Sequence, residues 1–552
     1  MVQPLKPGIV ADPKTRFNGK RLTTFLILCI WLLSILSCSV LNLSPLAFNP
    51  TASIELNTQS PDPNEMATLE PDPEVTSTQT DITETAEPLN PTEQITAAIE
   101  LLNPTEAAQN GIKTPPILYY TQAGDTLDVV AIRFGVGPSE ITSPDEIPAQ
   151  GLLQPGQLLI IPSRLGETTP ADEIMPDSEI VYSPSAVDFD TIKYVKDAGG
   201  YLNTYSQYLK DGQYTGAQVV QRVAVENSIN PRLLLALLEY QSHWVFGQPA
   251  NLAEQDYPMG YIDFNSKGLY AQLSWAMTQL SDGYYGWREG LLTELVFTDK
   301  QQLRLAPGLN AGTVAIQYLF SKLNDQPHWG GMIYGTESFP ALHKRLFGDP
   351  WLRAQTVEPL YPQNLTQPKL ELPFEPGHTW SFTKGPHYAW GPGGALAAID
   401  FAPMAAKSGC VPSNEWVTAS AAGLIVRSQD GIVVEDLDGD GYEETGWDLM
   451  YLHIATVGRI PAGTWVSTDD RIGHPSCEGG DAIGTNLHFA RKYNGEWMPV
   501  GGPLPMVLSG WVAHAGNAIG VGSLTKGNQI ANACSCGSSD TLVTRPKEDD
   551  QN

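Results

Sequence analysis

Positive charge is scarce in this sequence of 552 residues. There are 32 Lys and Arg against 61 Asp and Glu, so the formal net charge is −29. Such a field repels a phosphate backbone, because nucleic-acid binding relies on Lys and Arg to neutralise phosphates. The composition therefore argues against nucleic acid as a partner.

Cysteine is also rare. Six cysteines are too few for a fold that depends on a disulfide framework, and the nine histidines are few enough to consider one by one. Hydrophobic residues, by contrast, make up 42% of the chain. This is enough apolar material for real cores and excludes disorder throughout. The length predicts three or four structural units.

The N-terminus carries an export signal. Basic residues between Lys6 and Arg21 precede an apolar run over 25–36, and this order directs export with the basic end left in the cytoplasm. Three outcomes stay open for residues 1–45. Ile35–Cys38 resembles a bacterial lipobox, in which Cys38 is lipidated; the segment could instead be an uncleaved anchor of ~20 residues or a cleaved secretory signal. Each outcome places the remaining chain outside the cytoplasm.

Two segments have the composition of linkers. Residues 46–116 are acidic, rich in Pro and Thr and almost without aromatic residues. Such a segment cannot bury enough surface to offset its conformational entropy. We predict an extended disordered spacer there and a shorter linker over 166–185.

Residues 117–165 lie between these linkers and combine strand-like ends with a helical middle. The stretches 123–127 (AGDTL), 132–135 (IRFG) and 155–162 (PGQLLIIP) resemble the landmarks of the LysM module in order and spacing. The resemblance implies a small βααβ fold that binds N-acetylglucosamine-containing glycans such as peptidoglycan. A small spacer domain that binds nothing is the alternative.

Residues 186–360 show helical periodicity, and Asn230-Pro231 supplies an N-cap and a first-turn proline for an apolar helix. The stretch 227–242 (NSINPRLLLALLEYQS) resembles the lysozyme-like soluble lytic transglycosylases, which implies an all-α domain. Gln241 stands where that family has its catalytic glutamate. Because an amide cannot protonate a leaving oxygen, we predict a degenerate domain without glycosidase activity.

Short β-rich runs separated by Gly, Pro and Asp predict a β-rich domain over 371–512. It contains His387, Asp400, His453 and His488. A lone histidine in such a domain is more often structural than a ligand. Two histidines and an aspartate on neighbouring strands can nevertheless form a three-ligand zinc site with an open position for water. A metal-free structural remnant is the alternative.

The ordered set resembles the LytM or lysostaphin-type peptidoglycan metalloendopeptidases, especially their staphylolysin-like branch, in which the first ligand lies in a Gly-Pro-His loop. This resemblance implies that His387, Asp400 and His488 bind one zinc ion. It also implies that His453 is catalytic. Asn486 stands where the family usually has a second catalytic histidine. An asparagine amide can hold a water or donate to an oxyanion, but it cannot exchange a proton at neutral pH.

The same domain carries an acidic motif. Asp436, Asp438 and Asp440 form the Asp-x-Asp-x-Asp-Gly opening of a calcium loop. The twelfth position is Trp447 rather than a bidentate glutamate. A calcium site and an acidic turn without an ion therefore remain alternatives.

Two cysteines of this domain, Cys410 and Cys477, would meet an oxidising compartment and could form a disulfide; two buried free thiols are the alternative. The polar residues 513–552 are predicted to form a C-terminal tail. It contains Cys534 and Cys536, to which the sequence assigns no role.

Together these features predict a multidomain protein. A signal or anchor and a disordered linker precede a βααβ LysM module, an all-α lysozyme-like domain and an all-β or α+β LytM-type metallopeptidase domain. The favoured function is an exported zinc metalloendopeptidase of the bacterial cell envelope that cuts peptide cross-links of peptidoglycan. The alternative is a catalytically impaired protein that binds peptidoglycan or regulates another hydrolase. A glycan-cleaving enzyme would need Glu239 or another carboxylate in place of the missing acid.

Overall fold

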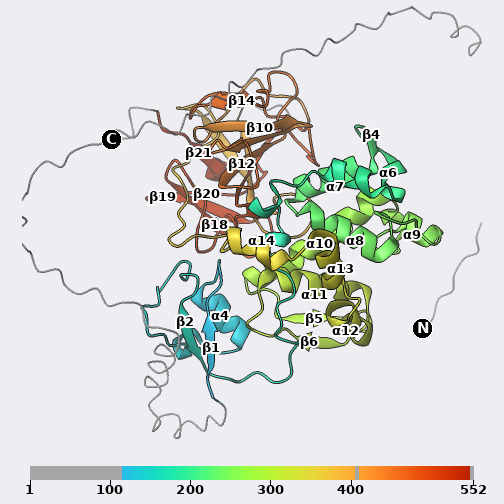
Figure 1. The fold of residues 1–552 in the computed structure, drawn as a ribbon. Coiled ribbons are helices and arrows are strands. Elements are labelled where there is room, and N and C mark those ends of the chain that lie inside the picture. The colour runs from blue at the N-terminus through green and yellow to red at the C-terminus, as the bar shows by residue number, and fades with distance from the viewer. Residues whose placement is uncertain (1–114, 405–408, 548–552) are drawn as a thin grey trace, which may run out of the picture. The chain divides into compact units, whose positions relative to one another are not determined.

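The computed structural model describes residues 115–404 and 409–547 (Figure 1). The predicted signal or anchor over 1–45 and nearly all of the predicted spacer over 46–116 lie outside the described residues. Within the described ranges, no helix combines the length and the apolar character that crossing a membrane requires.

A small α/β unit comes first. Its elements are β1 (Ile117–Tyr120), α4 (Leu127–Phe134), the 3₁₀ turn η1 (Pro138–Glu140) and β2 (Leu158–Ile161). β1 and β2 pair antiparallel. Helix α4 begins where the Thr126 hydroxyl accepts the N–H of Val129, and it ends at Gly135, whose φ of 66° suits glycine. The second helix of the predicted βααβ order is a single 3₁₀ turn.

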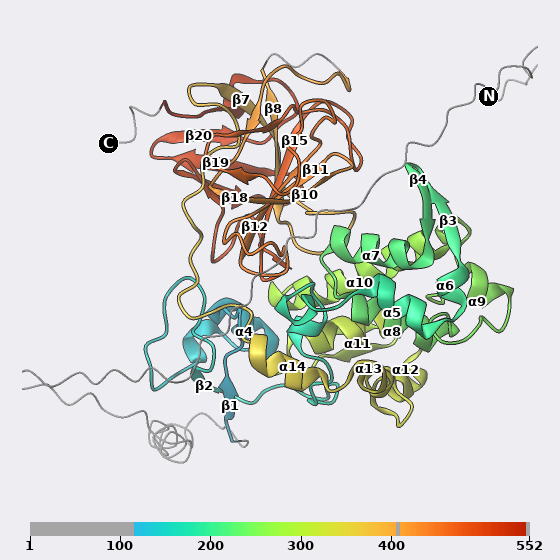
Figure 2. The same cartoon turned by 45° about the horizontal axis from the view of Figure 1, so that its top comes forward.

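Helices dominate the next unit (Figure 2). Its elements are η2 (Asp177–Glu179), η3 (Pro184–Ala186), α5 (Thr191–Ala198), α6 (Tyr201–Thr204), β3 (Ser206–Leu209), β4 (Gly212–Thr215), α7 (Gly216–Asn227), α8 (Pro231–Ser242), α9 (Leu252–Asp256), η4 (Phe264–Ser266), α10 (Leu269–Arg288), β5 (Glu294–Val296), β6 (Gln302–Arg304), α11 (Ala311–Leu323), α12 (Gln326–Tyr334), α13 (Phe339–Phe347) and α14 (Pro350–Val357). Asn230 caps α8 and Pro231 occupies its first turn. Gly283 allows α10 to approach α11, since a Cβ there would lie 2.9 Å from the Ala315 Cα.

The predicted linker over 166–185 is wrong in its second half. Met175 and Ile180 are fully buried in the core of the helical unit. Asp177 accepts a hydrogen bond of 2.7 Å from the N–H of Gly312 at the start of α11. The polar, proline-containing composition that indicated a linker belongs instead to tight turns whose polar groups are satisfied inside the fold.

The last unit is built on a nine-stranded sheet with the path β13-β10-β11-β12-β15-β8-β7-β21, in which β16 also pairs with β15. A four-stranded sheet, β17-β18-β19-β20, and the pair β14-β9 complete it. The strands are β7 (Thr379–His387), β8 (Ala398–Pro403), β9 (Val417–Thr418), β10 (Gly423–Gln429), β11 (Ile432–Asp436), β12 (Trp447–Leu452), β13 (Trp465–Val466), β14 (Arg471–Gly473), β15 (Leu487–Tyr493), β16 (Glu496–Trp497), β17 (Val507–Leu508), β18 (Trp511–Ala515), β19 (Gly522–Lys526), β20 (Gln529–Asn532) and β21 (Leu542–Thr544). The centre of the large sheet therefore holds β12, β15 and β8 side by side.

The prediction that residues 513–552 form a tail is also wrong. Strands β18 to β20 belong to the four-stranded sheet, and β21 extends the large sheet by pairing with β7. Arg545 is 2% exposed and donates to the carbonyl oxygens of Leu372 and Phe374. The polar composition of this segment reflects short strands that each bury only one or two side chains.

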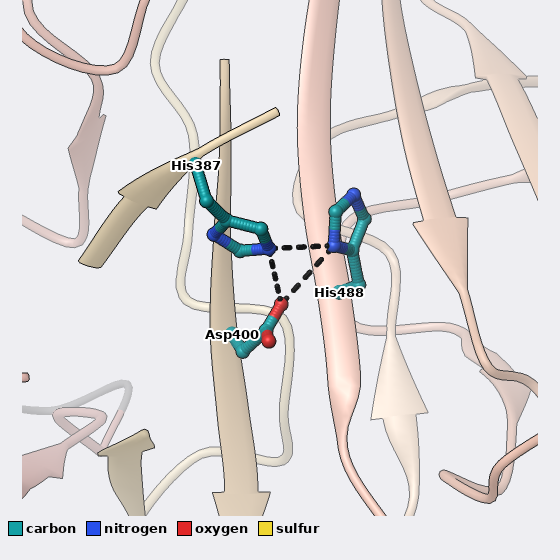
Figure 3. Close-up of side chains that lie close together, drawn as sticks. All are labelled: His387, Asp400 and His488. Atoms are coloured by element: carbon teal, nitrogen blue, oxygen red, sulfur yellow. Dashed lines mark hydrogen bonds and ion pairs between the residues drawn. The ribbon is translucent and has the colours of Figure 1, made fainter. Parts of the chain in front are cut away.

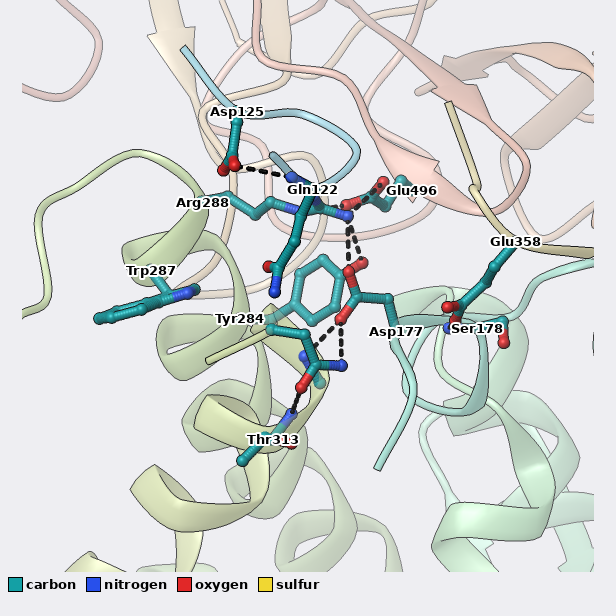
Figure 4. Close-up of polar contacts among 12 residues, drawn as sticks. Gln122, Asp125, Asp177, Ser178, Tyr284, Trp287, Arg288, Thr313, Glu358 and Glu496 are labelled. Atoms are coloured by element: carbon teal, nitrogen blue, oxygen red, sulfur yellow. Dashed lines mark hydrogen bonds and ion pairs between the residues drawn. The ribbon is translucent and has the colours of Figure 1, made fainter. Parts of the chain in front are cut away.

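Buried ionic contacts join the helical unit to the β-rich unit (Figure 4). Arg288 at the end of α10 pairs with Asp177 of η2 (Nη2–Oδ2, 3.0 Å) and with Glu496 of β16 (Nε–Oε1, 3.0 Å). Apolar side chains of both units, including Leu280 of α10 and Trp497 of β16, belong to one buried cluster. The two units share a core as well as a chain.

Candidate metal centre

Three neighbouring strands carry the predicted ligands. His387 ends β7, Asp400 lies on β8 and His488 lies on β15 (Figure 3). His488 and Asp400 are cross-strand partners in the β15–β8 register, so their side chains share one face of the sheet. Strand β7 shifts its register to β8 twice before His387. Such irregularities re-aim a side chain, and here His387 points at the other two.

The ligand atoms of these residues form a compact triangle. His387 Nε2 lies 3.0 Å from His488 Nδ1, and each of these nitrogens lies 3.1 Å from Asp400 Oδ1 (Figure 3). His387 is 5% exposed and His488 is 6% exposed. The three predicted ligands are therefore brought together, and they are sheltered from solvent.

Backbone carbonyls fix both imidazole rings. His387 Nδ1 donates to the carbonyl oxygen of Gly385 at 2.8 Å, and His488 Nε2 donates to that of Ala389 at 2.9 Å. Because a carbonyl can only accept, these nitrogens carry the protons. In their neutral form the two rings point their lone pairs at each other, as metal-ligating histidines do when the second nitrogen is held by a carbonyl.

The triangle fits a small cation of zinc type. Tetrahedral zinc with ligands at about 2.0–2.1 Å separates ligand atoms by roughly 3.3 Å, close to the observed 3.0 and 3.1 Å. Asp400 Oδ1 is buried without a hydrogen bond among the described residues, although two nitrogens approach it closely. Two imidazoles and a carboxylate are also a donor set that zinc prefers.

The carboxylate of Asp400 is held in its ionised form. Without a metal, burial favours the protonated acid, but hydrogen bonds and positive charge from the protonated rings of His387 and His488 outweigh burial and hold the pKa of Asp400 well below its ordinary value. In a metal site the cation would take the place of these ring protons. An ionised carboxylate is the form that binds a metal. The electrostatics of the trio thus agree with its geometry.

His453 lies next to this centre. It directly follows β12, has a φ of 70° and is 4% exposed. Its Nδ1 lies 3.1 Å from the carbonyl oxygen of Glu478, and its ring centroid lies 6.2 Å from that of His488. Burial, reinforced by His488, lowers the pKa of His453. The ring is therefore neutral near pH 7, with Nδ1 as donor and Nε2 as acceptor.

The side-chain amide of Asn486 is hydrogen-bonded within its own loop. Its amide nitrogen donates to the carbonyl oxygen of Gly484 at 2.9 Å. Its Oδ1 is buried and has no hydrogen-bond partner among the described residues. The amide thus offers an acceptor and no transferable proton.

The loop after His387 rests on the helical unit. Gly394 donates its N–H to Asp282 of α10 at 3.0 Å, and the Thr278 hydroxyl of α10 donates to the carbonyl oxygen of Pro392 at 3.1 Å. Ala389, whose carbonyl orients His488, is 3% exposed. Sequence reasoning missed these contacts, because the atoms that orient the rings belong to the backbone and leave no signature in residue type.

The remaining candidates fall into place as follows. Cys410 and Cys477 form a disulfide with a Cα–Cα distance of 5.4 Å. Gln241 lies in α8. Glu239 accepts the N–H groups of Val245 and Phe246, both at 2.9 Å, so this carboxylate closes the turn after α8.

Within the described part of the chain, two other groups of side chains have ligand atoms near one another. The predicted Asp436, Asp438 and Asp440 form one of them. Sequence reasoning missed the other, Glu375, His378 and Glu415. It is a partly exposed ion-pair cluster in which Arg471 already binds Glu375 at 2.8 Å. Cys534 and Cys536 also form a disulfide.

Comparisons with known proteins point to a class of enzyme and do not test the individual ligands. A family profile described as "LasA, N-terminal domain" matches residues 173–361. Protease LasA of Pseudomonas aeruginosa (strain UCBPP-PA14) is 27% identical over 352 residues, which cover 59% of this chain and 75% of that protein. Beta-lytic metalloendopeptidase of Lysobacter enzymogenes is 26% identical over 135 residues, 24% of this chain and 74% of that protein. These matches support an M23-type peptidase.

A solved structure described as a novel M23 metalloprotease, pseudoalterin, from the deep sea is 20% identical. The likeness covers 31% of this chain and 96% of that structure, with a TM-score of 0.26. The family profile begins at residue 173, inside the predicted linker, which agrees with the burial of that segment. The likenesses of 117–165 to LysM and of 186–360 to lysozyme-like enzymes stay predictions.

Proposed function

We propose that this chain is an exported, cell-wall-directed zinc metalloendopeptidase that hydrolyses peptide cross-links of bacterial peptidoglycan. One observation carries the proposal. Two imidazole lone pairs and a buried, ionised carboxylate converge at 3.0–3.1 Å, with both outer ring nitrogens already donating to carbonyls. With neutral rings and no cation, this arrangement sets three acceptors against one another, which is unfavourable in a buried site.

The residues of the site divide the chemistry among them. His387, Asp400 and His488 would hold the ion. Bound there, zinc would lower the pKa of a coordinated water and polarise the scissile carbonyl. His453, neutral and donating from Nδ1 to the Glu478 carbonyl, presents Nε2 as the group that takes up a proton or orients the water. The Oδ1 of Asn486 can hold a water but cannot exchange a proton.

The substrate class rests on the resemblance of 371–512 to the lysostaphin-type peptidoglycan endopeptidases. Export and membrane tethering rest on residues 1–45, with Cys38 as the candidate for lipidation. A tether would raise the effective concentration of the peptidase at a nearby wall. Glycan binding by residues 117–165 would add a second attachment to the same polymer.

A concave site supports the glycan-binding part. The loop at Gly124 and the loop over 151–155 line a cavity of about 270 Å³, and Tyr361 and Leu365 line it as well. The test is calorimetric titration of the purified chain with N-acetylglucosamine oligomers. Saturable binding at micromolar to millimolar concentration is expected, and no heat at millimolar oligomer would remove this part of the proposal.

The peptidase is tested with the purified chain, its metal content and intact peptidoglycan. We expect about one zinc per chain and release of peptide fragments identified by mass spectrometry. The variant His387→Ala should lose both. The matched control is His514→Ala, an exposed histidine of the same unit that contacts Thr525, and it should lose neither.

Each other result points elsewhere. Stoichiometric zinc without release of peptides would favour the alternative function, a catalytically impaired protein that binds peptidoglycan or regulates a hydrolase. The observation that favours this alternative is the amide of Asn486, whose nitrogen is already hydrogen-bonded to the Gly484 carbonyl. Reducing-sugar release would indicate a glycosidase. A chain without transition metal would refute the zinc peptidase.

A further inference from the structure

The backbone at His453 is strained, and a neighbouring segment holds it in place. His453 has a φ of 70°, a left-handed conformation that residues other than glycine keep only where surrounding contacts impose it. The segment 475–478, which lies between β14 and β15, supplies such contacts. Ser476 donates twice to the carbonyl oxygen of His453, from its N–H at 2.7 Å and from its hydroxyl at 2.9 Å. Two donors thus fix the peptide group that follows this histidine.

The same segment also holds the imidazole ring. The Nδ1–H of His453 donates to the carbonyl oxygen of Glu478 at 3.1 Å, and this hydrogen bond sets the tautomer of the ring. The N–H of Glu478 in turn donates to the hydroxyl of Ser476 at 3.0 Å. Ser476 further accepts the N–H of Asn486 at its carbonyl oxygen, at 3.2 Å. The segment therefore contacts both residues to which the proposed function gives a part beside the metal.

A disulfide is attached to the middle of this segment. Cys477 stands between Ser476 and Glu478, the two residues that bind His453, and it is bonded to Cys410. A covalent bridge at this point limits how far the segment can move away from the histidine. Cys410 is exposed and Cys477 is half-buried. The bridge therefore restrains a surface segment next to the proposed site.

The stretch 409–413 around Cys410 has further contacts with the chain beside the site. The N–H of Ser413 donates to the carbonyl oxygen of Pro475 at 3.0 Å, and the hydroxyl of Thr485 donates to that of Val411 at 2.6 Å. Hydrogen bonds at an exposed surface compete with water, so each contributes little to holding this stretch. The disulfide is the contact here that water cannot replace.

The three metal-binding candidates depend on other elements. His387, Asp400 and His488 lie on β7, β8 and β15, and their rings are oriented by the carbonyls of Gly385 and Ala389. These residues lie outside both stretches that the disulfide joins. The sheet thus holds the trio, whereas the bridged segment holds the histidine beside it.

We propose that Cys410 and Cys477 are positioning residues for His453. Their disulfide keeps the segment 475–478 in place, and the segment keeps His453 in the backbone conformation and the tautomer that leave Nε2 as the acceptor. The inference rests on the proposed function for the part that His453 plays in turnover. Opening the bridge should therefore lower turnover while the metal stays bound.

The double variant Cys410→Ser/Cys477→Ser opens the bridge without leaving a single thiol that could bind the metal. The matched control is Cys534→Ser/Cys536→Ser, which removes the disulfide between β20 and β21 in the same unit. With cross-linked muropeptides as substrate, kcat should fall at least about tenfold in the first variant, because a misplaced reacting group is costly, and KM should change less than about twofold. The control should keep both constants, and both variants should keep about one zinc per chain.

Nitrogen-15 NMR of the histidine-labelled chain observes the ring itself. In the parent, His453 should carry its proton on Nδ1, because the Glu478 carbonyl can only accept. In Cys410→Ser/Cys477→Ser the population should shift toward the Nε2–H tautomer, which imidazole prefers in water. The variant His453→Gln assigns the signal among the nine histidines. A disulfide that only stabilises the fold would lower the melting temperature and leave both the tautomer and kcat unchanged.

The outcomes separate this inference from the proposed function. An unchanged tautomer, or an unchanged kcat in an active protein, would overturn it. Loss of zinc in step with activity would place the effect at the metal centre and would also overturn it. If the parent releases no peptides, the proposed function fails and the tautomer decides this inference. If the double variant does not melt cooperatively, Ser476→Ala decides, because it removes the hydroxyl that links His453 to Glu478; it should show the same tautomer shift, and its absence overturns the proposal.

Discussion

Replacing Arg288 with methionine tests how strongly the helical unit and the β-rich unit depend on one buried charge. The Arg288 side chain is 9% exposed and pairs with Asp177 and Glu496, each at 3.0 Å. Methionine keeps much of the side-chain volume and removes the charge and its donors. The change therefore isolates the ionic contribution more cleanly than truncation to alanine.

The magnitude follows from what each partner retains. Asp177 keeps hydrogen bonds from Gly312 and Asn310, at 2.7 and 2.9 Å. Glu496 is fully buried and keeps only the hydroxyls of neighbouring tyrosines. Removing one partner of a buried ion pair costs about 3–5 kcal/mol, because the other charge stays buried. We expect a loss in that range, and it comes mainly from Glu496.

Urea unfolding at pH 8 and pH 5 measures the loss. Burial already raises the pKa of Glu496 against the opposing charge of Arg288, and without the arginine it should rise further. Protonation of Glu496 at pH 5 would then remove the unpaired buried charge from the variant, so its loss of unfolding free energy relative to the parent should shrink as the pH falls. The double variant Arg288→Met/Glu496→Gln should recover about 1–3 kcal/mol at pH 8. A deficit below about 1 kcal/mol that is equal at both pH values would refute this account of the cluster.

Four further predictions follow from contacts described above. Cys477→Ser opens a loop of 67 residues and should lower the free energy of unfolding by about 4 kcal/mol in the chain-entropy model, measured by urea denaturation under non-reducing conditions. Burial raises the pKa of Glu435 to about 8, so its contribution to stability is lost as the pH rises from 4.5 to 8. Glu435→Gln should become more stable relative to the parent across that window, by about 4 kcal/mol. Burial, together with nearby arginines, lowers the pKa of His343 to about 3. The free energy of unfolding of the parent should therefore fall by about 1.4 kcal/mol for each pH unit below 6.5. A scan of melting temperature against pH should show a shallower slope for His343→Gln. Glu239→Gln should cost about 1 kcal/mol of stability through its two backbone hydrogen bonds and leave peptide release from peptidoglycan unchanged, whereas loss of a sugar-cleaving activity in that variant would contradict its structural role.

The ligand trio was accessible from the sequence because each member is a side chain of distinctive chemistry. His387, Asp400 and His488 stand in an order that matches a known family, and strand periodicity sets which face each one occupies. The carbonyls of Gly385 and Ala389, which determine the ring tautomers, were not accessible. They depend on register shifts in β7 and on the path of a loop, and neither is encoded by residue type.

The two wrong boundaries share a physical cause. Composition describes whether a segment can bury apolar surface, but it does not show which polar groups find partners far away in the sequence. Asp177 and Arg545 lie in segments that look like a linker and a tail, yet both are buried and bonded to distant residues. The burial of Asp448 without a hydrogen-bond partner among the described residues was equally hidden in the sequence.

The contact of α10 with the loop after His387 bears on how this protein can be dissected. A fragment that begins near residue 371 would lack Asp282 and Thr278, on which that loop rests, and would expose the apolar side of Trp497 to water. The loop also supplies the Ala389 carbonyl that steers His488. A fragment holding only the β-rich unit would thus lack the support of the loop that lines the proposed metal centre, so kinetics measured on it would describe a different, looser site.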